Sequence, residues 1–146
     1  MTKRFDIAVI GGGVVGLAIL RRFAMSGLKC VLLEKGADIL SGASKGNSAL
    51  LHTGFDAPPK SLELQCIKAG NAEYLEIRQK LNLPLLETGA LVVAWNEQER
   101  EALLGIIGKA EANGIKDARP LNQTELRIRE PQLSKSALAA VFVPGE

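Results

Sequence analysis

The sequence predicts an α/β fold: the first part of a doubly wound parallel sheet, followed by the start of an α+β domain. Three observations support this class. An Ile- and Val-rich run at 5–10 ends in a glycine cluster. A helical pattern at 14–26 leads to a second apolar run at 29–35. From residue 62 onward, helical and strand patterns alternate without an internal repeat.

The first three elements form a β-α-β unit. The run 5–10 is short and continuously apolar, as expected for a parallel strand that is covered on both faces. The helical pattern of 14–26 places its apolar residues on one face and ends at Gly27. Because 29–35 repeats the strand pattern, the three elements are expected to make a right-handed crossover.

The rest of the chain is predicted to begin with an irregular stretch at 36–60, which is long for a compact domain and therefore typical of a binding segment. Apolar residues then recur at steps of three and four over 62–81, which predicts a helix. Strands are expected at 89–95 and 137–143.

Two further helices are predicted from their capping residues. Asn96 is followed three residues later by Glu99, and Asn122 by Glu125. At this spacing, the N-cap side chain and the N3 side chain each bond the other's backbone N–H group. The first of these helices is expected to end at Asn113, and the second is short.

Composition limits the classes of function. The 146 residues are 47% hydrophobic and 23% charged, values that exclude disorder as the main state. The net charge of +2 is spread along the chain, so no nucleic-acid partner is expected. Glycines interrupt the apolar N-terminal run, so neither a signal peptide nor a transmembrane segment is predicted. Cys30 and Cys66 do not form a CxxC pair, which predicts no metal site and a cytoplasmic location, with peripheral membrane contact left open.

Residues 11–16 read Gly-Gly-Gly-Val-Val-Gly and match the pattern GxGxxG between a predicted strand and a predicted helix. Gly11 permits the tight turn, Gly13 allows a pyrophosphate to approach the backbone, and Gly16 lets the helix pack closely on the sheet. The helix N-terminus offers N–H groups and a partial positive charge to the phosphates. The loop therefore predicts a dinucleotide site.

Glu34 stands at the end of the second predicted strand, about twenty residues after the glycines, where the dinucleotide fingerprint places an acidic residue. A carboxylate there accepts the ribose hydroxyls and would repel a 2′-phosphate, so NADP is disfavoured. The neighbouring Lys35 is included in the predicted cofactor site. The loop and the acid together are compatible with both FAD and NAD.

The segment 41–55 separates these two cofactors. A run of small residues is followed by Asn47 and Ser48, an apolar pair, His52, and Gly54 before an aromatic residue. This order resembles the second flavin-contacting segment of the D-amino-acid-oxidase-like superfamily of FAD oxidoreductases. The closest likeness is to the branch with glycerol-3-phosphate dehydrogenases and L-2-hydroxyglutarate oxidases, and it continues over essentially the whole chain. The resemblance implies FAD as the cofactor.

The same resemblance implies roles for individual residues. Ser44 and Asn47, with Ser48 beside them, are expected to hold the pyrophosphate or the ribityl chain. Gly54 is expected to let the backbone approach the isoalloxazine. His52, the only histidine of the sequence, is expected near the flavin. It is either the catalytic base or a hydrogen-bonded histidine without a role in proton transfer.

The resemblance further implies a two-domain enzyme, in which a Rossmann-like FAD-binding domain is interleaved with a substrate domain built on an antiparallel sheet. Residues 1–59 are assigned to the first portion of the FAD-binding domain and 60–146 to the start of the substrate, or cap, domain. Members of this family are far longer, and only two parallel strands are visible here. We therefore expect a truncated chain with uncovered apolar surfaces, which either forms homo-oligomers or binds FAD weakly, if at all.

The function expected from the resemblance is oxidation of a small hydroxy acid or polyol phosphate by hydride transfer to flavin. One alternative is an amine or amino-acid oxidase of the same superfamily, and another is a truncated module without activity of its own. Oxygen, a quinone and an iron–sulfur partner all stay open as electron acceptors.

Overall fold

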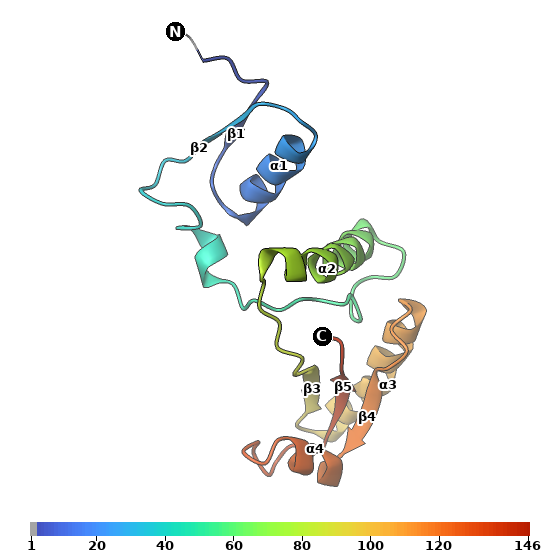
Figure 1. The fold of residues 1–146 in the computed structure, drawn as a ribbon. Coiled ribbons are helices and arrows are strands. Elements are labelled where there is room, and N and C mark those ends of the chain that lie inside the picture. Colours follow the sequence, from blue (N-terminus) through green and yellow to red (C-terminus); the bar gives the residue numbers. More distant parts are fainter. Residues whose placement is uncertain (1–2) are drawn as a thin grey trace. The chain divides into compact units, whose positions relative to one another are not determined.

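The computed structural model describes residues 3–146, which divide into two compact units, one up to Ala49 and one from Leu50 to Glu146 (Figure 1). Each unit has a sheet of its own, with two parallel strands in the first and three antiparallel strands in the second. The predicted α/β class is confirmed. The assignment of 1–59 and 60–146 to an FAD-binding and a substrate domain stays a prediction.

The first unit is the predicted β-α-β unit. It contains β1 (Ile7–Ile10), α1 (Val14–Met25) and β2 (Cys30–Leu33), and both strands are shorter than the sequence pattern indicates. The two strands pair in parallel, from Ile7 opposite Cys30 to Ile10 opposite Leu33. The N–H group of Gly11 continues the ladder by donating to the carbonyl of Leu33 at 2.8 Å. The glycine loop and the end of β2 therefore lie side by side.

The first unit buries little apolar surface. Among its described residues only Val9 and Gly12 are buried, and no residue of α1 is. Val15, Ile19 and Phe23 of α1 are all exposed. A parallel sheet normally has both faces covered, so this unit by itself leaves apolar helix surface open to solvent, as expected from its two visible strands.

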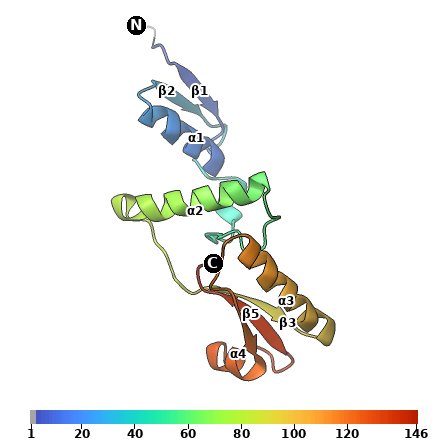
Figure 2. The same cartoon turned by 90° about the vertical axis from the view of Figure 1, so that its right-hand side faces the viewer.

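The second unit consists of three helices and three strands. In chain order these are α2 (Leu62–Leu81), β3 (Ala90–Ala94), α3 (Glu97–Ala112), β4 (Arg119–Asn122), α4 (Gln123–Arg129) and β5 (Ala139–Val143). The sheet order is β3-β5-β4, so the last strand occupies the centre. Figure 2 shows α3 alongside this sheet and α4 at one end of it.

The core of the second unit lies on both faces of β5. Val141 and Val143 belong to a buried cluster with Leu103 and Ala110 of α3. Side chains of a strand alternate between its two faces, so Ala140 and Phe142 instead join a second cluster, with Leu121, Leu126 and Ala137. The central strand therefore lies between two apolar layers and is buried up to its last residue, Val143.

The strand β4 was not predicted. It has four residues, lies at the edge of the sheet and contains Pro120. Proline is tolerated at a sheet edge because its missing N–H group is not needed there. Asn122 ends this strand and also caps α4, so the strand pattern passes into the helix without a linker.

Both predicted capping asparagines are confirmed. Asn96 Oδ1 accepts the N–H of Glu99 at 2.9 Å, and Asn122 Oδ1 accepts the N–H of Glu125 at 3.0 Å. Glu125 completes a capping box by accepting the N–H of Asn122 at 2.8 Å. Glu99 reaches one residue further back and accepts the N–H of Trp95 at 2.7 Å, so the two helix starts differ in detail.

Candidate functional site

The predicted phosphate-binding loop is the turn from β1 into α1. Gly11 has a φ of +102°, a backbone conformation that costs glycine no steric penalty. A Cβ atom on Gly16 would lie 2.0 Å from the carbonyl oxygen of Gly11. Only a glycine at position 16 therefore lets the first turn of α1 lie against the end of β1. The tight turn and the close packing expected from the pattern are both present.

The N-terminus of α1 is open to an anionic ligand. Gly13 is its N-cap and offers no capping side chain, and the first turn contains no acidic residue. The N–H group of Val14 donates to Ser44 Oγ at 2.9 Å. The Ser44 hydroxyl can still donate its own proton to a phosphate oxygen. The fold thus brings Gly13 and Ser44 together at the helix end that favours phosphate.

Glu34 contacts the backbone of the glycine loop through its carboxylate. Its Oε2 accepts the N–H of Gly12 at 2.5 Å, and its Oε1 accepts the N–H of Gly36 at 2.7 Å. The N–H group of Gly12 first, and that of Gly36 second, hold the pKa of the Glu34 carboxyl below its ordinary value. An ionised carboxylate has about four acceptor positions, so the bonds to Gly12 and Gly36 leave capacity for ribose hydroxyls.

The sequence pattern did not assign roles to Gly12 and Gly36. A Cβ on Gly12 would lie 3.1 Å from Glu34 Oε2, and one on Gly36 would lie 2.9 Å from Ser41 Oγ. A side chain at either position would therefore crowd the Glu34 carboxylate or the Ser41 hydroxyl, which favours glycine at both. The available signal was the glycine two residues after the acid, a spacing at which an acidic side chain bonds its own backbone.

Asn47 shapes the loop that presents Ser44. It follows the short 3₁₀ helix η1 (Ala43–Gly46). Its Nδ2 donates to the carbonyl of Ser44 at 2.6 Å, and its Oδ1 accepts the N–H of Ala49 at 2.6 Å. These local bonds use both ends of the side-chain amide. Direct contact of Asn47 with the cofactor stays a prediction, as it does for the exposed Lys35 and Ser48.

His52 belongs to the second unit and is bonded on one side only. Its Nδ1 lies 2.5 Å from Glu146 Oε1. The side chain of Glu146 is 3% exposed and that of His52 is 53% exposed. Glu146 Oε2 accepts both the N–H and the hydroxyl of Thr53, at 2.8 and 2.6 Å. Glu146 had no predicted role, because a pair so distant in sequence leaves no local pattern.

Gly54 is required by packing within the second unit. Its φ is +87°, and a Cβ would lie 2.8 Å from Leu64 Cδ1 of α2. Its carbonyl accepts Asn113 Nδ2 at 2.8 Å, and the same amide donates to the carbonyl of Ala57 at 2.8 Å. Asn113 was predicted only as the end of a helix, yet it anchors this loop. The approach of Gly54 to a flavin stays a prediction.

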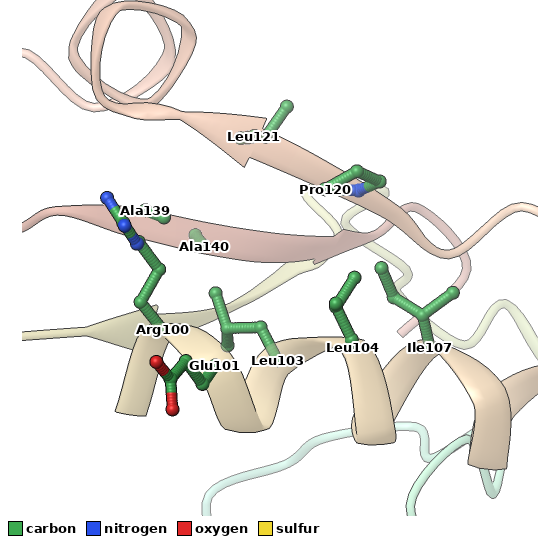
Figure 3. Close-up of a pocket in the computed structure, with 9 residues that line it drawn as sticks. All are labelled: Arg100, Glu101, Leu103, Leu104, Ile107, Pro120, Leu121, Ala139 and Ala140. Carbon is green, nitrogen blue, oxygen red and sulfur yellow. The ribbon is translucent and has the colours of Figure 1, made fainter. Parts of the chain in front are cut away.

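A cavity of about 300 Å³ between α3 and the sheet has a different character. Figure 3 shows Leu103, Leu104 and Ile107 of α3 extending towards Pro120 and Leu121 of β4. Its lining contains none of the predicted site residues and is mostly apolar. This cavity therefore supplies no acid–base group other than the two charged side chains at its rim, Arg100 and Glu101.

Neither a metal-binding cluster nor a membrane-spanning helix is found within residues 3–146. Within this range, no group of three or more metal-ligating side chains comes together. None of the helices described there is long and apolar enough to cross a membrane.

Known proteins resemble the chain over nearly its whole length. Glycerol 3-phosphate dehydrogenase of Caloramator mitchellensis is 30% identical over 138 residues, which are 94% of this chain and 29% of the relative. The mitochondrial L-2-hydroxyglutarate dehydrogenase of Homo sapiens is 31% identical over 132 residues, 89% of this chain and 28% of the relative. The chain therefore spans less than a third of the length of these two curated relatives.

A solved structure and a family model also match the chain over nearly its whole length. The crystal structure of glycine oxidase from Bacillus cereus ATCC 14579 superposes with a TM-score of 0.79 and 32% identity, over 97% of this chain and 39% of that one. Residues 6–146 match the family model of FAD dependent oxidoreductases, called DAO. The predicted resemblance is confirmed, and with it FAD rather than NAD as the cofactor of the family. The chain belongs to the DAO family of FAD-dependent oxidoreductases.

Proposed function

We propose that the protein oxidises a small hydroxy acid or polyol phosphate, with His52 taking the hydroxyl proton and FAD taking the hydride. The observation that carries the proposal is the environment of His52. Its Nδ1 is bonded to a buried carboxylate, whereas half of the ring surface is exposed. This arrangement leaves Nε2 free to accept a proton from a substrate, which is what a general base requires.

The residues of the first unit fit the adenosine diphosphate half of FAD. The start of α1, where Gly13 carries no capping side chain, and the hydroxyl of Ser44 would face the pyrophosphate. Glu34 would accept the ribose hydroxyls, and its lowered pKa keeps it an ionised acceptor. A glycine at position 16 is needed for this geometry because any Cβ would collide with Gly11. FAD, when bound, supplies the two-electron acceptor.

The proposed reaction is balanced by two transfers. FAD, when bound, would supply the acceptor for the hydride of the substrate carbon, so the carbon–hydrogen bond and the hydroxyl proton would both be accounted for. The hydroxyl proton moves to Nε2 of His52, and the substrate carbon becomes a carbonyl carbon. Because the ring of His52 is half exposed, it can later release this proton to water.

An amine or amino-acid oxidase is the second candidate, and the likeness to a glycine oxidase at 32% identity favours it. The same histidine could take a proton from an amino group. The two relatives described above act, by their names, on a polyol phosphate and on a hydroxy acid, which is why the hydroxylated substrate class is preferred.

Anaerobic reduction of the FAD-loaded protein separates these candidates. Glycerol 3-phosphate, L-2-hydroxyglutarate, glycine and sarcosine are added separately, and the loss of flavin absorbance is followed. We expect a hydroxylated compound to bleach the flavin and the two amines to leave it oxidised. Bleaching by glycine or sarcosine alone would instead establish the amine-oxidase alternative. Reoxidation by oxygen or by a quinone in the same cuvette then identifies the acceptor class.

A further inference from the structure

We propose that Glu146 is a positioning residue that keeps the proton of His52 on Nδ1 and thereby leaves Nε2 as the basic nitrogen. This inference rests on the proposed role of His52 in the reaction. It assigns to Glu146 the task of fixing which ring nitrogen of His52 carries the proton. The bond between Glu146 Oε1 and His52 Nδ1 joins parts of the chain that are 94 residues apart.

Glu146 is held in place by its backbone as well as by its partners. It follows β5, the central strand, and its N–H group donates to the carbonyl of Val143 at 3.3 Å. Its side chain is 3% exposed. A buried carboxylate is costly unless donors surround it, and here the donors are the N–H and hydroxyl of Thr53 and the ring of His52.

The chemistry of a carboxylate determines which nitrogen of His52 carries the proton. An ionised carboxylate only accepts hydrogen bonds, so the ring nitrogen that contacts it must donate. In the neutral imidazole, a proton on Nδ1 means that Nε2 is unprotonated. When the ring gains a proton, Nδ1 keeps its bond to Glu146 and the exchangeable proton lies on Nε2.

The backbone around His52 is held at the same time. Asn71 of α2 donates from Nδ2 to the carbonyl of His52 at 3.1 Å. The next residue, Thr53, is tied to Glu146 by two bonds. The ring is therefore oriented by its Nδ1 bond and by a backbone that is fixed on both sides. In catalytic sites generally, the hydrogen bond made by one ring nitrogen of a histidine sets which nitrogen carries the proton.

A glutamine at position 146 reverses this arrangement without changing the size of the side chain. The side-chain amide has one accepting and one donating end. The backbone N–H of Thr53 can only donate, so the amide oxygen must face Thr53. The NH₂ group then faces Nδ1 of His52, which has to accept, and the ring proton moves to Nε2. The variant would place a proton on the atom that should act as the base.

The chain offers a direct spectroscopic test because His52 is its only histidine. The 146-residue chain is prepared untagged with ¹⁵N-labelled histidine, and the two ring nitrogens are observed by NMR at a pH where the ring is neutral. We expect the wild type to carry its proton on Nδ1 and Glu146→Gln to carry it on Nε2.

Two variants control this experiment. Glu87→Gln removes an exposed carboxylate of the same unit and should leave the proton on Nδ1. Thr53→Val keeps the backbone donor to Glu146 and should also leave it there. A wild type with its proton on Nε2 would overturn the proposal whether or not the variants fold. Identical tautomers in the wild type and in a folded Glu146→Gln chain would overturn it as well.

Turnover by the FAD-loaded protein is the second readout. General-base catalysis contributes about 10²- to 10⁴-fold to a rate, so we expect Glu146→Gln to lower kcat at least about 100-fold with little change in KM. If His52→Gln keeps its turnover, the proposed base is wrong although the NMR result stands. If His52→Gln loses turnover while Glu146→Gln keeps it, the positioning role of Glu146 is wrong and the proposed base stands.

Discussion

Glu34 Oε2 accepts the N–H group of Gly12 at 2.5 Å, across 22 residues of sequence. This bond joins the two halves of the dinucleotide fingerprint, the glycine loop and the acid. The same carboxylate accepts the N–H of Gly36. The backbone N–H groups of Gly12 and Gly36 therefore orient the Glu34 carboxylate.

The acid dependence of Glu34 follows from these bonds. Its pKa lies below the ordinary value of 4.5 because the N–H groups of Gly12 and Gly36 stabilise the ionised form. The stabilisation is fully present above pH 4.5 and is lost as the pH falls through the pKa of the folded state. We expect a small effect, because Glu34 is only partly covered.

Urea unfolding of the wild type and of Glu34→Gln, measured from pH 7 down to acid, tests this sign. The wild type should be the more stable of the two above pH 4.5, and the difference should shrink below that value. A stability difference that grows as the pH falls would contradict the assignment.

Gly16 provides a test of the loop geometry. In an exposed helix interior, replacing glycine by alanine stabilises by about 0.5–1 kcal/mol. Gly16→Ala should do the reverse, because the new Cβ would lie 2.0 Å from the carbonyl oxygen of Gly11. We expect a loss of about 1–3 kcal/mol in the free energy of unfolding. Gly70→Ala in α2 is the matched control and should stabilise, since nothing lies within 4 Å of its Cβ position.

His52→Gln tests the proposed base. We expect kcat for a hydroxylated substrate to fall about 10²- to 10⁴-fold while the protein keeps its flavin. Steady-state turnover and the visible flavin spectrum together provide the measurement. Turnover within a few-fold of the wild type would leave His52 as a hydrogen-bonded histidine without a role in proton transfer.

Asn113 is expected to contribute strongly to the stability of the second unit. It is 2% exposed, and its Nδ2 donates to the carbonyls of Gly54 and Ala57. Asn113→Ala leaves these acceptors unpaired and should cost about 1–3 kcal/mol. Asn113→Asp should cost at least as much, because its carboxylate oxygens would face the two carbonyls. Chemical unfolding measures both, and an Asp variant as stable as the wild type would contradict the contact.

The local elements were predictable from the sequence because their signals are local. The helix over residues 62–81 has the predicted bounds, and Ser61 caps it by accepting the N–H of Leu64 at 3.0 Å. The two asparagine caps were equally visible. By contrast, β4 has only four residues with a proline, so its pairing with β5 is set by the sheet and not by its own pattern.

The site residues were predictable from the sequence where the backbone conformation or close packing admits only one residue type. Gly11 and Gly16 belong to this class. The acid that follows β2 was predictable for another reason, its fixed spacing after the glycines. Glu146 was not predictable, because its contact with His52 depends on how the end of β5 meets a loop 94 residues earlier. Asn113 was visible as a helix end, whereas its bond to the Gly54 carbonyl requires tertiary packing.

FAD affinity is the most direct test of the site formed by the glycine loop and Glu34. The purified protein is titrated with FAD and the quenching of flavin fluorescence is followed for the wild type, Glu34→Ala and Glu34→Gln. Glu34→Ala removes a charged hydrogen-bond acceptor, so it should raise the Kd about tenfold or more, with Glu34→Gln in between. A Kd for Glu34→Ala equal to that of the wild type would show that Glu34 does not hold the ribose of FAD.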